Sequence, residues 1–151
     1  MKLAANLIVL VTFINLVNNV VQLANSNCHS IRTRQIFYSI FDIIIWPSAA
    51  HLSFYYGLYG ILQEPGKNHQ KRLRIYMVTQ AFLVVLWFAY AIIGSGAKNG
   101  WTKFTKFKHC HLDDPESKFE FAKFLTVVEI MIYYLSMLLG IRCIYKVYSD
   151  D

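Results

Sequence analysis

Four apolar stretches, each long enough to cross a lipid bilayer, constrain the fold of this chain more than any other feature. They cover about residues 3–24, 36–62, 75–97 and 121–145. A membrane-spanning helix needs roughly 20 mostly apolar residues. A water-soluble bundle would show a polar face on every helix, and "AFLVVLWFAYAII" shows none. The sequence therefore predicts an all-α integral membrane four-helix bundle, with four transmembrane spans and short polar loops, forming a single transmembrane domain over residues 1–151.

Composition narrows the class of partner. Of the 151 residues, 56% are hydrophobic and only 16% are charged, which excludes a disordered chain. The formal net charge is +6. The predicted loops and chain ends on the two sides of the membrane carry nearly equal numbers of Lys and Arg, so these numbers do not determine the orientation. The expected partners are the lipid bilayer and other membrane protein subunits, and no nucleic acid. The mitochondrial inner membrane is one expected location, with an endomembrane or the plasma membrane as alternatives.

The first apolar stretch carries uncharged polar side chains on one side. At 100° per residue, Asn15, Asn18, Asn19 and Gln22 fall in one arc beside Thr12, and the apolar residues between them fall in the other. An amide without a partner in hydrocarbon costs several kcal/mol. This face is therefore expected to meet other helices through hydrogen bonds, or to form a solvated functional lining.

Two carboxyl groups are predicted at a similar depth in other spans. Counted inward from the side of the first and third loops, Asp42 and Glu129 lie in the same layer as Asn19. Ionisable residues inside a membrane suggest a functional site by default. The hypothesis is an intramembrane polar network, used either as a neutral structural link or as a proton or cation site. Its predicted members are Asn15, Asn19, Gln22, Asp42 and Glu129.

Small residues at helical spacing predict close helix packing. Ala49, Ser53 and Gly57 follow one another at every fourth position, and Ser136 and Gly140 do the same in the last span. Small side chains allow the backbones of neighbouring membrane helices to approach closely.

The polar loops hold cysteine and histidine. Cys28 and Cys110 are predicted on one side of the membrane and are candidates for a disulfide in an oxidising compartment. The alternative is that Cys28, Cys110 and neighbouring histidines bind zinc or copper, but the spacing matches no established motif, so neither a metal nor a cofactor is predicted. "GSGAKNG", residues 94–100, reads as a flexible exit from the third span.

Two stretches resemble known membrane families. "LVTFINLVNNVV" with "WPSAAHLSFYYGLYG" resembles the androgen-induced family of membrane hydrolases that cleave fatty-acid esters of hydroxy fatty acids. This resemblance implies Thr12 as a nucleophile, although the family's N-H-x-x-x-H-T pattern is missing and the chain is two spans short. "YYGLY" after the second span resembles the secretory carrier membrane proteins, which have four spans, but their aromatic-Arg-Pro segment is not reproduced.

No catalytic set of residues accompanies these features. The chain has no Walker loop, GxSxG, HExxH or GxGxxG motif. The sequence therefore favours a non-enzymatic membrane protein that packs within a larger complex. Accessory subunits of respiratory or ATP-synthase-type complexes and trafficking tetraspans are two concrete forms. The alternatives are a proton or cation channel or transporter component that uses Asp42 and Glu129, and a lipid-ester hydrolase that uses Thr12.

Overall fold

The computed structural model describes residues 2–24, 33–62, 67–93, 98–107 and 116–149, and these residues form helices without any strand. Four of the helices are long, and each of the four is apolar enough over its length to cross a membrane. The expectation of an all-α chain with four such helices is confirmed. The elements are α1 (Lys2–Ala24), α2 (Thr33–Leu62), α3 (Lys67–Ile92), the short α4 (Trp101–Phe107) and α5 (Glu116–Ser149).

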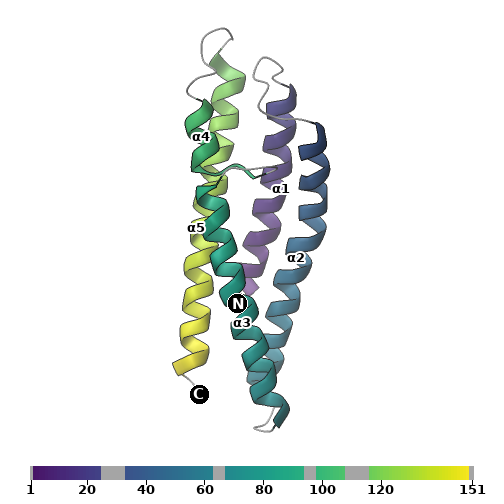
Figure 1. Ribbon diagram of the computed structural model, residues 1–151, viewed down its shortest axis with the longest axis vertical. Coiled ribbons are helices and arrows are strands. Elements are labelled where there is room, and N and C mark those ends of the chain that lie inside the picture. Colours follow the sequence, from purple (N-terminus) through teal and green to yellow (C-terminus); the bar gives the residue numbers. More distant parts are fainter. Residues whose placement is uncertain (1, 25–32, 63–66, 94–97, 108–115, 150–151) are drawn as a thin grey trace.

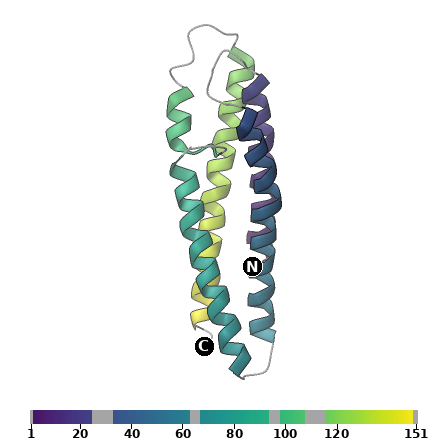
Figure 2. The ribbon, with the colours of Figure 1, turned by 45° about the vertical axis from the view of Figure 1, so that its right-hand side comes forward.

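The four long helices pack side by side with alternating directions (Figure 1). α1 contacts α2 and α5, and α3 contacts the same two helices, so α1 and α3 occupy opposite corners of the bundle. α1 begins above the lower ends of α2, α3 and α5, as both views show (Figure 1, Figure 2). The start of α1, the end of α2, the start of α3 and the end of α5 therefore lie toward one end of the bundle, called here the lower end.

Apolar side chains cover the outside of the bundle, and polar side chains fill part of the inside. Phe13 on α1 is 58% exposed, whereas Asn15, Asn18 and Asn19 on the same helix are fully buried. This is the reverse of the arrangement in a water-soluble bundle. It is the arrangement expected where the surrounding medium is hydrocarbon and polar groups must find partners inside the protein.

Several helices extend beyond the apolar stretches. α3 begins at Lys67 rather than residue 75, because "KNHQKRLR" consists largely of good helix formers and still buries Leu73 against the bundle. α5 begins at Glu116, directly after a proline, which favours the first turn of a helix. α4 was not expected.

Glycines set the closest helix approaches. A Cβ atom at Gly57 would lie 2.7 Å from the Tyr76 ring of α3, and one at Gly140 would lie 2.6 Å from Val84. The hydroxyl of Ser53 donates to the side-chain oxygen of Gln80 across 3.4 Å. Among the residues predicted for packing, Ser53, Gly57, Ser136 and Gly140 are buried, and Ala49 is half-buried beside the buried Ala50.

Candidate functional site

The carboxyl group of Glu129 lies at the centre of a buried polar layer. Glu129 belongs to α5 and is fully buried. Its Oε1 accepts hydrogen bonds from Asn18 (2.7 Å) and Asn99 (3.0 Å), and its Oε2 accepts from Asn15 (2.9 Å) and Asn99 (3.3 Å). Three amides from two separate parts of the chain therefore converge on one carboxyl group.

A second set of bonds orients the amide of Asn15. Its Oδ1 accepts from Asn19 (3.3 Å) and from the Ser39 hydroxyl of α2 (3.2 Å). Asn19 also donates to the Ser39 oxygen at 2.6 Å. Because the amide oxygen of Asn15 already faces these donors, its NH₂ group points toward Glu129. The layer thereby joins α1, α2 and α5.

Gln22 and Asn99 close the layer above Glu129. Gln22 donates to Asn18 Oδ1 at 2.9 Å and to Asn99 Oδ1 at 3.2 Å. Asn18 also donates to the hydroxyl of Thr126, one turn before Glu129 on α5. Asn18 and Asn99 each serve both as donor and as acceptor, which fixes their orientation, whereas the buried side-chain oxygen of Gln22 has no hydrogen-bond partner among the described residues.

Residues 98–100 follow α3 without helical structure, and all three are buried. Residues 98–100 thus lie in the interior rather than in an exposed exit from the third span, while residues 94–97 of that segment lie outside the described residues. Asn99 bonds to Glu129 and to amides of α1, as described above. Backbone without regular structure needs hydrogen-bond partners when it is enclosed by protein, and the side chain of Asn99 in this segment is fully bonded.

The side chain of Lys98 places a cation beside the second carboxyl group. Its Nζ lies 2.7 Å from Asp42 Oδ2 and 4.9 Å from the centre of the Tyr90 ring. Trp46 donates to the other oxygen of Asp42 at 2.8 Å. The Lys98 ammonium is buried, so Asp42 supplies the charge that compensates it.

An aromatic cluster lies beside this ion pair. The rings of Trp87 and Tyr133 are stacked with centres 5.8 Å apart, and Trp46 and Tyr90 pack against Trp87 at 5.7 and 5.9 Å. Tyr133 is fully buried. Such rings contribute large apolar contact areas, so the polar layer rests on a tightly packed core.

Thr12 lies on the same face of α1 but does not share these contacts. Its hydroxyl donates to the backbone carbonyls of Ile8 (2.9 Å) and Val9 (3.0 Å) within its own helix. Thr12 is fully buried. A nucleophile needs an adjacent base and access to substrate, so this geometry offers nothing in favour of a hydrolase.

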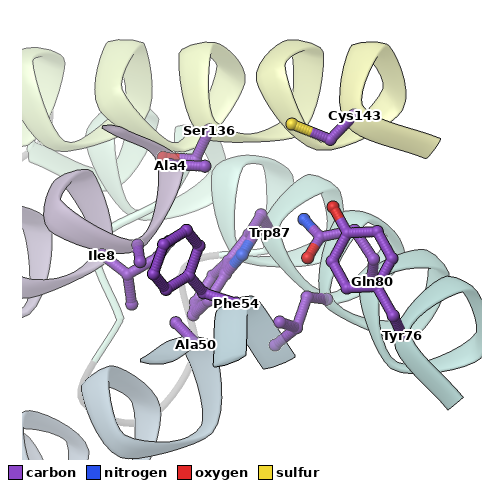
Figure 3. Close-up of a pocket in the computed structure, with 11 residues that line it drawn as sticks. Ala4, Ile8, Ala50, Phe54, Tyr76, Gln80, Trp87, Ser136 and Cys143 are labelled. Atoms are coloured by element: carbon purple, nitrogen blue, oxygen red, sulfur yellow. The ribbon is translucent and has the colours of Figure 1, made fainter. Parts of the chain in front are cut away.

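A small cavity lies lower in the bundle (Figure 3). Its volume, counted as the space open to the centre of a water molecule, is about 20 Å³, enough for about one water. Ser136 and Gln80 line it. The buried Ser136 hydroxyl has no hydrogen-bond partner among the described residues. The size of the cavity and its polar lining suit a single water molecule.

The structure places the predicted network residues in two neighbouring groups. Asn15, Asn19 and Gln22 lie around Glu129, whereas Asp42 pairs with Lys98. Ser39 and Thr126 were missed, although each lies three residues before one of the two carboxyls and hence on the same helix face. No pattern in the sequence indicated that Lys98 and Asn99 lie inside the bundle.

The predicted disulfide residues, Cys28 and Cys110, lie outside the described residues. Cys143, on α5, is half-buried. Within the described segments, no group of three or more His, Cys, Asp or Glu side chains is placed to hold a metal ion.

Fold and site together define an all-helical bundle with four helices apolar enough to span a membrane and an acidic group enclosed by amides. Comparison of the chain with family models, curated proteins and solved structures finds no significant match.

Proposed function

We propose that this chain is an integral membrane protein whose four long helices cross the bilayer. Two exposed tyrosines on α2, Tyr38 and Tyr59, are 21 residues apart, or about 31 Å at 1.5 Å per residue. The hydrocarbon core of a bilayer is about 30 Å thick, and tyrosine is enriched at both of its surfaces. Between them the outer face of α2 presents Phe41, Ile44, Ile45 and Leu52.

We infer that the protein acts as a structural subunit of a larger membrane assembly. The observation that carries this proposal is that both oxygens of Glu129 accept hydrogen bonds from amides that tie α1 and the 98–100 segment to α5. These polar groups are engaged in holding the chain together. The outer faces remain for contacts with lipid and other subunits, and α5 alone presents Phe124, Met131, Leu135, Leu138 and Tyr145.

Two settings fit such a subunit. One is an accessory role in a respiratory or ATP-synthase-type complex of the mitochondrial inner membrane, and the other is a trafficking tetraspan of an endomembrane or the plasma membrane. The proteins that co-purify with the chain distinguish the two.

Transport of protons or cations is the second candidate function. It is favoured by the proximity of Asp42, Lys98 and Glu129, which places two acidic groups and one basic group in the same buried region. In that mechanism at least one carboxyl must release its present partners during each cycle. In the structural mechanism none of them does.

Purification at native expression levels in mild detergent, followed by a native gel, tests the assembly proposal. We expect the chain to migrate in a complex well above its monomer mass. Replacing Phe124, Leu135 and Leu138 by alanine removes bulk from the outer face of α5, and the matched control replaces Val78, Phe82 and Val85 on α3. Loss of the complex from one set locates the interface. A chain that runs as a free monomer would refute the assembly.

Proton and cation flux in proteoliposomes tests the second candidate. Glu129→Gln, checked for folding by size-exclusion profile, abolishes flux if the carboxyl carries the proton or cation. The structural proposal predicts no flux above protein-free liposomes for either the native chain or this variant.

A further inference from the structure

The lower end of the bundle carries exposed basic side chains from two helices. Lys71 and Arg74 are exposed near the start of α3, and Arg142 and Lys146 are exposed near the end of α5. The last turns of α5 lie beside α3, because Val147 packs in one apolar cluster with residues of the second and third turns of α3. Figure 1 shows that both helices continue below the start of α1 and that α3 begins further down than α5 ends.

The acidic residues of the described segments all lie in the other half. They are Asp42 near the start of α2 and Glu116, Glu120 and Glu129 in the first half of α5. Two basic residues of that half are neutralised by them, since Lys98 pairs with Asp42 and Lys123 with Glu120.

Among the described residues, the near-tie between the two faces in Lys and Arg counts therefore hides an asymmetry in net charge. Glu64, Asp150 and Asp151, which neighbour the lower end in sequence, lie outside the described residues.

Exposed tyrosines mark the depth of the basic side chains. Tyr59 on α2 and Tyr145 and Tyr148 on α5 are 46%, 71% and 77% exposed. The guanidinium of Arg72 lies 4.8 Å from the centre of the Tyr59 ring. Tyrosine rings sit at the level of lipid headgroups, and long basic side chains extend to the same level from a buried stem.

We propose that the lower end binds the headgroups of anionic phospholipids, with Lys71, Arg74, Arg142 and Lys146 as the cationic contacts. The proposal rests on membrane insertion, as proposed above, and adds the lipid class and the leaflet. Anionic leaflets attract basic residues close to the membrane surface, and Lys and Arg are enriched on the cytoplasmic side. The lower end, with the start of α1 and the end of α5, accordingly faces the cytoplasmic or equivalent anionic leaflet.

The experiment measures binding of short-chain lipids to the detergent-purified full chain. The probes are dioctanoyl phosphatidylserine and dioctanoyl phosphatidylcholine. The test variant is Arg74→Gln with Lys146→Gln, and the matched control is Arg34→Gln with Lys123→Gln, which removes the same charge from the other end. A basic residue near the surface contributes about 1 kcal/mol, which is about fivefold in affinity. The test pair should therefore weaken phosphatidylserine binding about 30-fold, and the control pair should leave it within about twofold.

Several results would overturn the proposal. If the chain binds the two lipids equally well, it does not select the anionic headgroup. If both variant pairs lose the same affinity for phosphatidylserine, the lower end is not the binding site. Displacement of phosphatidylserine by inorganic phosphate at equal concentration would indicate a simple anion site instead. Extraction of the native chain by alkaline carbonate would refute membrane insertion separately, since the binding measurement itself needs no bilayer.

Discussion

Replacing Glu129 by glutamine changes one oxygen of a fully buried carboxyl into an NH₂ group. In the structure both oxygens accept from amide donors, at 2.7 to 3.3 Å. Whichever way the new amide turns, its NH₂ group faces at least one of the donors Asn15, Asn18 and Asn99. These cannot simply flip, because the Asn15 and Asn18 oxygens already accept bonds from Asn19 and Gln22. We therefore expect the network to be weakened by this substitution of a single atom.

The magnitude follows from the number of donors left without an acceptor. A buried donor that loses its partner costs about 1–3 kcal/mol, so Glu129→Gln should lower the free energy of unfolding by about that amount. In a chain of this size each kcal/mol corresponds to about 2–4 °C in Tm, which gives a decrease of about 2–12 °C. Glu129→Leu leaves all three amides without the carboxyl and should cost about three times as much, a large part of the 5–15 kcal/mol typical of a folded domain.

The assay is thermal unfolding of the purified chain in mild detergent, with Glu120→Gln as the matched control. Glu120 is on the same helix, its side chain is 59% exposed, and it pairs with Lys123 at 2.9 Å. An exposed pair of this kind contributes less than about 1 kcal/mol. A Tm for Glu129→Gln equal to that of Glu120→Gln would show that Glu129 does not hold the layer together.

Three further predictions concern other parts of the molecule. Gly57→Leu should separate α2 from α3, because even a Cβ atom there would lie 2.7 Å from the Tyr76 ring; its Tm should fall well below that of Leu58→Ala on the exposed face, and equal values would argue against close packing. Lys98→Met leaves the carboxylate of Asp42, 2.7 Å from the Lys98 ammonium, without its cation, and it should lower the Tm because removing one partner of a buried ion pair is destabilising. A Tm equal to that of the native chain would contradict this expectation. If the first and third loops face an oxidising compartment, Cys28 and Cys110 should react with an alkylating reagent only after reduction; reaction of both thiols in intact oriented membranes would exclude the disulfide.

The sequence by itself determined the class of fold and the inner face of α1. Four apolar stretches leave few alternatives to four long helices, because length and hydropathy are local properties of the chain. The period of Asn15, Asn18, Asn19 and Gln22 defines one helix face without reference to any partner, and the structure buries all four residues.

Only the tertiary structure decided which groups these amides meet. Helical period and depth place Asp42 and Glu129 in the same layer, but they do not specify which carboxyl turns toward α1. The packing of α1 against α5 brings Glu129 to Asn15, while Asp42 faces Lys98. The rotation of each helix about its own axis depends on contacts between residues that are distant in sequence. It therefore cannot be read from the local sequence.

The position of residues 98–100 was likewise decided only by the folded chain. A glycine-rich segment after a helix is typical of a surface loop, and nothing in "GSGAKNG" distinguishes an exposed connection from one that turns inward. Here Asn99 is fully buried and donates to both oxygens of Glu129. The reason is that a carboxyl buried among apolar helices requires hydrogen-bond donors. Asn99 supplies one of them although it lies 30 residues from Glu129 along the chain. This contact depends on the tertiary structure and leaves no pattern in the local sequence.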